Sequence, residues 1–369
     1  MIVVVSCLHF PDDERIYHRQ ILTLLRNGFE VKYYTRSSNS KNLSEKGLVH
    51  LNFSDNISIS QYKKIIFNNI LNTNKIFVIH IHEPQLFSLA IDIKISTGAK
   101  VIYDVHEDYP AIINTFSRWN KNIKRLKEKY WIFKEKQFLK HVNEIIVASS
   151  AIVNSNYKAQ GFNPIILENF PSKDFINEND NKKKIKNSII YHGSLAPERG
   201  IIELIEALPF VVNEIPDVTV SLYGSFRTNR FKSDVYSAIN RLKMNKVIFL
   251  HDHVLHKDIW RKLESHMIGV IPFNDNPLTR IGTPTKLFEF MATGCKVVCA
   301  DLPPMKRYDF KGLNFFQSGN IESLSNVLIN AMHNISNKDL LFNQEKIKSL
   351  YNWDFISHRL IDLYVRLLS

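Results

Sequence analysis

The stretch Gly282-Thr-Pro-Thr-Lys-Leu-Phe-Glu-Phe-Met-Ala-Thr-Gly294 has the pattern of a loop that turns directly into a helix. Pro284 suits the first helical turn, where its missing N–H costs nothing, and Gly294 suits the end of the helix. Apolar runs lie on both sides, at 267–273 and 296–300. The local order is therefore strand, loop, helix, strand.

The beginning of this helix predicts an anion-binding site. The first backbone N–H groups of a helix have no intrahelical acceptor, and Thr285, Lys286 and Leu287 supply them here. Lys286 adds a positive charge, and Glu289, one turn further on, can accept hydrogen bonds from sugar hydroxyls. Phosphate and ribose bound together would describe a nucleotide site. A capped surface helix whose Lys and Glu face water is the alternative.

Both halves of the chain alternate short apolar runs with helical patterns. In the second half we expect strands at 189–192, 218–223, 247–250, 268–273 and 297–300, and helices at 201–213, 231–242 and 259–264. In the first half we expect strands at 2–6, 31–35, 76–81, 101–105 and 144–148, a weak strand at 48–52, and helices at 14–26 and 86–97. Such near-continuously apolar strands predict an α/β protein with two doubly wound, Rossmann-like parallel sheets.

A polar run rich in Asn and Lys separates the two alternations and predicts a linker at 171–187. We therefore expect one Rossmann-like domain at 1–170 and a second at 188–350, with their strand ends facing across a cleft. The remaining segment, 351–369, is helical and follows the second alternation. It is expected to cross back and pack on the first domain.

Composition favours a globular protein with anionic partners. At 369 residues, with 44% apolar and 23% charged residues, the chain suits two domains. Its net charge of +12 favours nucleotides, phospholipid headgroups, pyrophosphate-linked lipids or nucleic acid. The base composition of the source genome is an alternative origin for part of that charge.

Cysteine usage and hydropathy bear on location. Three cysteines without metal-like spacing favour buried free thiols and a reducing cytoplasm. The apolar N-terminus predicts a first strand rather than a signal peptide. No window reaches the roughly 20 apolar residues that span a bilayer, so any membrane contact is expected to be peripheral.

Polar side chains gather where expected strands end, which is where open parallel sheets bind ligands. They are His9, Asp13 and Arg15, then His82 and Glu83, His106 and Glu107, and in the second half Gly193, Ser194, Arg199 and Gly224. The first domain thus offers histidines and carboxylates suited to hydroxyl groups, and the second offers cations suited to a diphosphate.

His80 and His82 share one face of a strand because they lie two residues apart. With Glu83 they offer part of a metal site, but the sequence identifies no further ligand, and no metal is expected. His106 is either a functional histidine or a hydrogen-bonded structural one. The sequence contains no G-x-G-x-x-G, G-x-x-x-x-G-K-[ST] or G-x-S-x-G, which argues against nicotinamide binding, P-loop chemistry and an α/β-hydrolase.

The segment 118–141 combines basic and aromatic residues. It holds nine Lys and Arg together with Trp119, Tyr130, Trp131, Phe133 and Phe138. Four of its apolar residues recur at helical spacing and are expected to pack on the sheet, namely Ile123, Leu126, Tyr130 and Phe133. The remaining basic face is a candidate for contact with an anionic membrane. A solvated face and RNA binding are the alternatives, although no RNA-binding signature is present.

Together these motifs resemble the retaining GT-B glycosyltransferases, specifically family four (GT4), over nearly the whole chain. The markers in the first half are Asp13-Glu14-Arg15-Ile16, Gly28-Phe29-Glu30-Val31, His80-Ile81-His82-Glu83-Pro84 and Tyr103-Asp104-Val105-His106-Glu107. Those in the second half are Tyr191-His192-Gly193-Ser194-Leu195, Arg199-Gly200 and Pro284-Thr285-Lys286-Leu287-Phe288-Glu289-Phe290-Met291 with Gly294. Each is weak alone, but their order and register are specific.

The resemblance implies transfer of a sugar from a nucleoside diphosphate donor to a hydroxyl of a glycan or lipid-linked acceptor, with retained anomeric configuration and no metal or other cofactor. Glu289 matches the glutamate that binds the donor ribose, Arg199 matches the cation on the diphosphate, and His106 matches the histidine near the transferring sugar. The implied catalytic residues are His106, Arg199, Lys286 and Glu289.

The expected binding residues divide between the two domains. Those for the donor are Gly193, Ser194, Arg199, Gly224, His253, Val254, Gly282, Thr283, Pro284, Thr285, Lys286, Leu287 and Glu289. Those for the acceptor are His9, Asp13, Arg15, His82, Glu83 and Glu107.

Two positions depart from the family pattern. Ile281 stands where a second, sugar-binding glutamate is usual, and Ser194 stands where an arginine often follows the glycine. Sugar contacts must then come from elsewhere, such as the backbone of Gly282–Pro284 or Asp275, and Lys286 compensates for the missing cation.

The expected protein is a cytoplasmic glycosyltransferase, peripheral on the inner face of the plasma membrane, that extends a surface polysaccharide or a lipid-linked glycan. Nucleic acid is not an expected partner. Three alternatives stay open: a nucleotide-sugar 2-epimerase of the same fold, a non-catalytic carbohydrate-binding protein and a nucleic-acid-binding protein.

Overall fold

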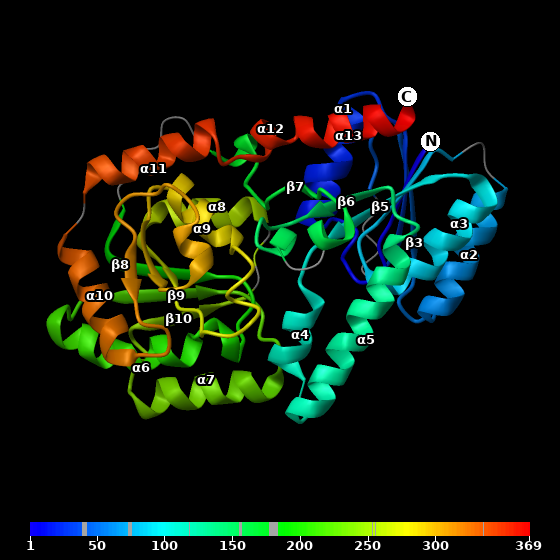
Figure 1. The fold of residues 1–369 in the computed structure, drawn as a ribbon. Coiled ribbons are helices and arrows are strands. Elements are labelled where there is room, and N and C mark those ends of the chain that lie inside the picture. The colour runs from blue at the N-terminus through cyan, green and yellow to red at the C-terminus, as the bar shows by residue number, and fades with distance from the viewer. Residues whose placement is uncertain are drawn as a thin grey trace. The chain divides into compact units, whose positions relative to one another are not determined.

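The computed structural model describes residues 1–38, 43–72, 76–117, 119–154, 157–176, 184–252, 254, 256–334 and 336–369. These residues form two compact units. Unit 1 comprises Met1–Asn169 and Trp353–Ser369, and unit 2 comprises Phe170–Asn352. Each unit contains one parallel sheet with helices packed around it (Figure 1), which confirms the predicted α/β class with two Rossmann-like sheets.

The sheet of unit 1 has seven strands in the order β3-β2-β1-β4-β5-β6-β7. They are β1 (Ile2–Val5), β2 (Val31–Arg36), β3 (Leu48–Phe53), β4 (Val78–Ile81), β5 (Lys100–Val105), β6 (Glu144–Val147) and β7 (Ile165–Ile166). β1 is central and pairs in parallel with both β2 and β4. Every residue of β1 and β4 is buried, as expected for apolar strands covered on both faces.

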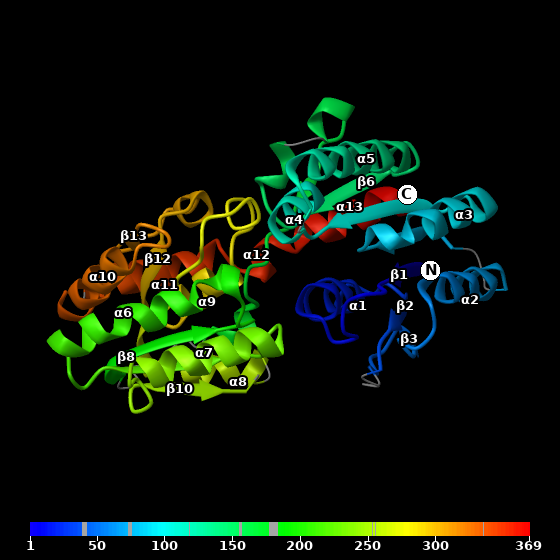
Figure 2. The ribbon, with the colours of Figure 1, turned by 90° about the horizontal axis from the view of Figure 1, so that it is seen from below.

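Helices connect these strands. A π-helical turn (Glu14–Ile21) leads into α1 (Leu22–Arg26), and the Asp13 carboxylate caps that turn by accepting from the N–H groups of Arg15 and Ile16. The other helices are α2 (Ile59–Leu71), α3 (Phe87–Thr97), α4 (Tyr109–Phe116) and α5 (Lys121–Leu139), with short 3-10 turns at Pro84–Leu86, Ile152–Asn154 and Lys158–Gln160. Helices α4 and α5 lie side by side (Figure 2).

The C-terminal helices α12 (Trp353–Ile356) and α13 (His358–Leu368) belong to unit 1. The Trp353 indole N–H donates to Thr23 Oγ1 at 2.9 Å, and the Tyr364 hydroxyl lies 2.8 Å from His80 Nδ1. Both contacts are buried, and Tyr364 itself is fully buried. The last segment of the chain therefore contributes to the interior of the first sheet domain.

Unit 2 has the strand order β10-β9-β8-β11-β12-β13. Its strands are β8 (Ile185–His192), β9 (Thr219–Tyr223), β10 (Ile248–His251), β11 (His266–Ile271), β12 (Lys296–Ala300) and β13 (Asn314–Phe316). Its helices are α6 (Ile201–Glu214), α7 (Asn229–Arg241), α8 (His256–Ser265), α9 (Thr285–Ala292), α10 (Ile321–His333) and α11 (Asn337–Ser349), with 3-10 turns at Lys173–Phe175, Pro197–Arg199 and Pro303–Lys306. The expected strand, loop, helix, strand order around 282–294 is confirmed.

Two local predictions differ from the structure. Strand β8 begins at Ile185, inside the segment predicted as a linker, and residues 177–183 of that segment lie outside the described residues. The prediction that four apolar residues of α5 pack on the sheet is wrong, since they are exposed: Ile123 by 40%, Leu126 by 69%, Tyr130 by 65% and Phe133 by 59%. The face that packs instead carries Glu135, Phe138 and Leu139. Periodicity identifies residues that share a helix face but not the direction in which that face points.

Among the described residues, no helix combines the length and the apolar content that crossing a bilayer requires.

Candidate functional site

The strand order of unit 2 places two loops next to each other at the carboxyl edge of the sheet. Chain order reverses between β8 and β11, which pair directly, and such a switch point is where doubly wound sheets bind ligands. The loop after β8 carries Gly193, Ser194 and Arg199, and the chain after β11 leads to α9. The predicted donor residues on these two segments therefore meet at one edge.

Glycines allow the loops of this edge to approach closely. A Cβ atom on Gly224, whose φ is +151°, would lie 2.0 Å from the carbonyl oxygen of Gly193. A Cβ atom on Gly200, whose φ is +67°, would lie 1.6 Å from the carbonyl oxygen of Pro272. Side chains larger than hydrogen would push both loops away from the end of β8.

Two cations share one aromatic ring at this edge. The guanidinium carbon of Arg199 lies 4.5 Å from the centre of the Phe273 ring, and Lys286 Nζ lies 5.0 Å from the same centre. Lys286 Nζ is also 5.3 Å from the centre of the Tyr191 ring. The faces of these rings stabilise positive charge, so they hold two cations near each other.

Burial, and then the positive charge of Arg199, lower the pKa of Lys286 to about 7, while Glu289 opposes the shift. The charged form of an amine with this pKa, next to a guanidinium, is stabilised most by an anion that lies against both groups. A diphosphate has that charge and size, so the pair suits the role predicted for it.

Glu289 is buried, and its carboxylate lies against a histidine ring. Its Oε2 lies 2.9 Å from Nε2 of His192, the last residue of β8. Glu289 lies one helical turn beyond Lys286 on α9, so both side chains face the end of β8.

The loop before α9 is fixed by its neighbours. Arg307 Nη1 donates to the carbonyl oxygen of Ile281 at 2.8 Å, and Thr283 Oγ1 lies 3.2 Å from the Tyr308 hydroxyl. Pro284 caps the helix, and the N–H of Leu287 donates to the Pro284 carbonyl oxygen at 3.1 Å. The N–H group of Leu287 is thus already hydrogen-bonded within the turn. Thr285 and Lys286 precede it as the first two residues of α9.

Three other predicted donor residues are less constrained. Ser194 and Gly282 are exposed, and Val254 is half-buried after β10. His253, which was predicted to bind the donor, lies outside the described residues.

In unit 1, Glu83 organises the loop that follows β1. Its Oε1 accepts from the Ser6 hydroxyl at 2.6 Å and from the N–H groups of Cys7 and Leu8, both at 3.1 Å. Glu83 is 3% exposed, so this carboxylate shapes the loop that carries His9. A role in binding an acceptor would have to use its other oxygen.

Asp104, at the end of β5, is the centre of a buried polar network. Arg15 donates to both of its oxygens, from Nε at 3.0 Å and from Nη2 at 2.7 Å, and Gln20 donates to Oδ2 at 2.6 Å. His82 Nδ1 and His106 Nε2 each lie 3.4 Å from the same Oδ2. Although burial alone would raise it, Arg15 and the two histidines hold the pKa of Asp104 well below its usual range.

Three predicted acceptor residues, His82, His9 and Asp13, are connected through His106 in a series of contacts next to this network. His82 Nδ1 lies 3.0 Å from His106 Nε2, and the ring centres of His9 and His106 are 4.8 Å apart. His9 Nδ1 in turn lies 3.2 Å from Asp13 Oδ2. Burial lowers the pKa of His106 despite Asp104. Burial alone would also lower the pKa of His9, but the hydrogen bond to Asp13 and the negative charges around the ring together outweigh it and raise that pKa.

The structure therefore gathers His9, Asp13, His82, Glu83 and His106 at the carboxyl edge of β1, β4 and β5. Glu107, the remaining predicted acceptor residue, is exposed. Arg15 is 4% exposed and holds Asp104, so its side chain supports this edge rather than facing an open surface.

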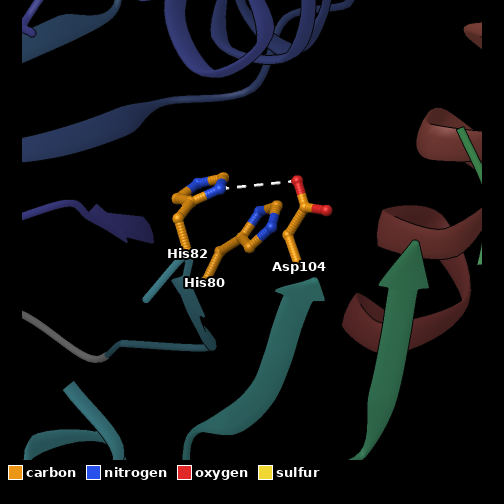
Figure 3. Close-up of side chains that lie close together, drawn as sticks. All are labelled: His80, His82 and Asp104. Atoms are coloured by element: carbon orange, nitrogen blue, oxygen red, sulfur yellow. Dashed lines mark ion pairs between the residues drawn. The ribbon is translucent and has the colours of Figure 1, made fainter. Parts of the chain in front are cut away.

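A potential metal-ligand group lies within the network, and Asp104 is its carboxylate rather than Glu83. One ligand atom each of His80, His82 and Asp104 lie within 4.8 Å of one another (Figure 3). However, the Arg15 guanidinium bonds both Asp104 oxygens, and the Tyr364 hydroxyl bonds His80 Nδ1. A fixed positive charge on the only carboxylate of the group opposes a divalent cation, so we interpret the group as a hydrogen-bonded support for His106.

Sequence reasoning missed four residues of these two edges: Asp104, His192, Arg227 and Phe273. Asp104 and His192 stand at strand ends within the quoted motifs, which was the available signal. Phe273 ends an apolar run and shows no polar signal. Arg227 Nη1 contacts the buried Glu198 carboxylate next to Arg199, and nothing in the local sequence predicts that contact.

Comparison with known proteins adds one family. Residues 186–334 match the family model described as "Glycosyl transferases group 1", which covers most of unit 2. No curated protein matches the chain in sequence.

Solved structures resemble the whole chain. Sucrose-phosphate synthase from Thermosynechococcus elongatus is similar with a TM-score of 0.79 and 13% identity, covering 100% of this chain and 98% of that one. A glycosyltransferase from Rickettsia africae has a TM-score of 0.74 and 15% identity, covering 100% and 98%. HepE from Anabaena, solved with UDP and glucose, has a TM-score of 0.73 and 14% identity, covering 99% of each chain. At these identities the likeness is one of fold.

Proposed function

We propose that this glycosyltransferase, which has the GT-B fold and a glycosyl transferases group 1 domain at residues 186–334, is a GT4-type enzyme that transfers a sugar with retention from a nucleoside diphosphate donor. The observation that carries the donor assignment is the pair of cations on Phe273, with Glu289 one turn beyond Lys286. HepE and an E. coli protein of similar fold were solved with UDP and with UDP-2-fluoro-glucose, which supports a UDP-sugar as the first donor to try.

The proposed chemistry follows from charge. As the glycosidic bond breaks, negative charge accumulates on the leaving diphosphate and the sugar becomes oxocarbenium-like. Arg199, Lys286 and the beginning of α9 are the groups of unit 2 that can stabilise the leaving diphosphate. Loss of one such contact typically costs about 3–4 kcal/mol at the transition state. Because these groups supply the positive charge, we propose that no metal ion is required.

Unit 1 is proposed to bind the acceptor. His106 has a lowered pKa and is therefore mainly neutral at pH 7, so its imidazole can accept or donate a hydrogen bond to a hydroxyl group. His9, with a raised pKa and a carboxylate partner, offers a second and more cationic group. A glycan or lipid-linked acceptor presents hydroxyl groups of the kind these histidines recognise.

We further propose that the enzyme works in the cytoplasm at the inner face of the plasma membrane, where it extends a surface polysaccharide or a lipid-linked glycan. The net charge of +12 supports attraction to an anionic surface or a pyrophosphate-linked lipid.

A donor screen followed by transfer assays tests the proposal. UDP-, GDP-, ADP- and CMP-sugars are first compared for thermal stabilisation, because a bound donor shifts the folding equilibrium. With the stabilising donor, Arg199→Ala and Glu289→Gln are expected to lose at least a hundredfold in kcat/KM. Arg241→Ala, which removes an exposed arginine paired with Glu206, is the matched control and should transfer normally.

Three outcomes would contradict parts of the proposal. Full activity of Arg199→Ala would remove the diphosphate assignment. Loss of activity after exhaustive chelation, restored by Mg²⁺, would contradict metal independence. Conversion of the nucleotide sugar without an acceptor would identify an epimerase instead.

A further inference from the structure

Helix α5 carries two unlike apolar faces, and only one of them packs against unit 1. The packed face contains Phe138, Leu139 and Glu135, and the Tyr157 hydroxyl donates to Glu135 Oε1 at 2.8 Å. Burial raises the pKa of Glu135 to about 7, so this carboxyl is only about half ionised at pH 7. The helix is therefore anchored along one side.

The second apolar face points away from that anchor. Ile123, Leu126, Tyr130 and Phe133 are 40–69% exposed. At about 100° per residue these four side chains fall within an arc of about 80°, on the side of the helix roughly opposite Glu135 and Leu139. We call these four residues the outer stripe. Large apolar side chains that lie together in solvent mark a surface built for contact.

Lysines border the outer stripe on both sides. Lys127 and Lys134 follow one edge, and Lys129, Lys136 and Lys140 follow the other, all with exposed side chains. Between Lys121 and Lys140 there are eight Lys and Arg against two Glu. Just before the helix, Trp119 is 45% exposed and lies 3.2 Å below Lys127 Nζ. Apolar side chains flanked by snorkelling lysines and an aromatic residue suit the boundary between headgroups and acyl chains.

We propose that the outer stripe docks α5 onto the surface of an anionic lipid bilayer, with the helix axis in the plane of the membrane. This inference rests on the proposed function, because it supplies the contact by which the enzyme reaches a lipid-linked acceptor. The stripe enters the acyl boundary, and the lysines on its two borders contact anionic headgroups.

Charge separates this occupant from two others. A second copy of the chain would bring the same lysines against this helix, and like charges at an interface core are unfavourable. A nucleic acid would use the lysines but would leave Leu126 and Ile123 in water. A lipid surface, in contrast to these two, satisfies both the stripe and its borders.

Flotation of the full-length protein tests the docking. The wild-type protein is mixed with vesicles of phosphatidylcholine and phosphatidylglycerol, or of phosphatidylcholine alone, at about 0.05 and 0.5 M salt. It should float with the anionic vesicles at low salt, and less at high salt. Leu126→Asp with Phe133→Asp should weaken the partition coefficient at least tenfold. Lys129→Gln with Lys136→Gln should weaken it roughly fivefold for each lysine.

Matched controls separate docking from folding and from catalysis. Phe210→Asp replaces an equally exposed apolar residue on α6, 58% exposed, and should float like the wild type. All variants alter exposed positions and should keep the wild-type unfolding temperature and the wild-type stabilisation by the donor sugar. An enzyme that transfers sugar to a water-soluble acceptor but does not float would refute the docking alone, and one that floats without transferring would refute the proposed function alone.

Three results would overturn the docking proposal. The first is that the Leu126→Asp, Phe133→Asp protein floats to the same extent as the wild type. The second is that the wild type binds both vesicle types equally at both salt concentrations. A wild-type dimer in analytical ultracentrifugation that this double variant converts to monomer would assign the stripe to a second copy instead.

Discussion

Donor binding should depend on pH through Lys286. This side chain is buried, and its pKa is about 7 among its protein neighbours. A donor diphosphate beside it favours the charged amine and raises that pKa. The bound state then holds more protons than the free state, so binding is strongest below pH 7 and weakens as pH rises. Above pH 7 the loss approaches tenfold in Kd for each pH unit until the pKa of the bound state is reached.

Calorimetry with a nucleotide sugar measures this effect directly. A nucleotide sugar is preferable to a free nucleoside diphosphate because its phosphates do not titrate between pH 6 and 9. At pH 7, where about half of the Lys286 amines are charged, binding should take up about half a proton, seen as a dependence of heat on buffer ionisation. Lys286→Met should bind the nucleotide sugar more weakly and lose the pH dependence. Lys306→Met, at an exposed lysine paired with Asp301, should keep the wild-type affinity and the wild-type pH dependence.

A flat affinity between pH 6 and 8.5 in the wild type, without proton uptake, would refute the reasoning. It would mean that the diphosphate does not approach Lys286. Retained pH dependence in Lys286→Met would assign the titration to another group.

Other substitutions test the two edges separately. Asp104→Asn leaves Arg15 buried without its counter-charge and should lower the free energy of unfolding by about 3–5 kcal/mol in chemical denaturation. Asp362→Asn, at an exposed carboxylate of α13, should not lower it. Gly224→Ala places a methyl group 2.0 Å from the Gly193 carbonyl oxygen, so donor stabilisation should be lost, whereas Gly282→Ala meets open space and should retain it. Tyr364→Phe removes the bond to His80 and should cost about 1–2 kcal/mol; no change would show that this bond is not stabilising.

Local chemistry accounts for what the sequence predicted well. Pro284 and Gly294 limit a helix by backbone geometry alone, and α9 lies between them. The buried parallel strands were predictable because continuous apolar runs leave few other arrangements. The predicted strand at 189–192 was shorter than β8, because Lys186 and Asn187 near the beginning of β8 interrupt that apolar signal.

Contacts between distant residues explain what the sequence could not predict. Arg15 and Asp104 are 89 residues apart, and their pairing depends on β1 and β5 lying in one sheet with a third strand between them. The prediction of which face of α5 packs inward was wrong for a related reason. Its sequence contains two apolar faces, and only the packing of Phe138 and Leu139 decides which one turns inward.

We expect the electrostatics of unit 2 to favour a diphosphate over a single phosphate. Arg199 and Lys286 lie on one aromatic ring, and their mutual repulsion contributes to the lowered pKa of Lys286. One phosphate against Arg199 would leave much of the lysine's burial uncompensated. Two linked phosphates can neutralise both cations, and this also restores the charge on Lys286. We therefore expect a diphosphate to keep Lys286 fully charged beside Arg199, and this should favour that ligand over a single phosphate.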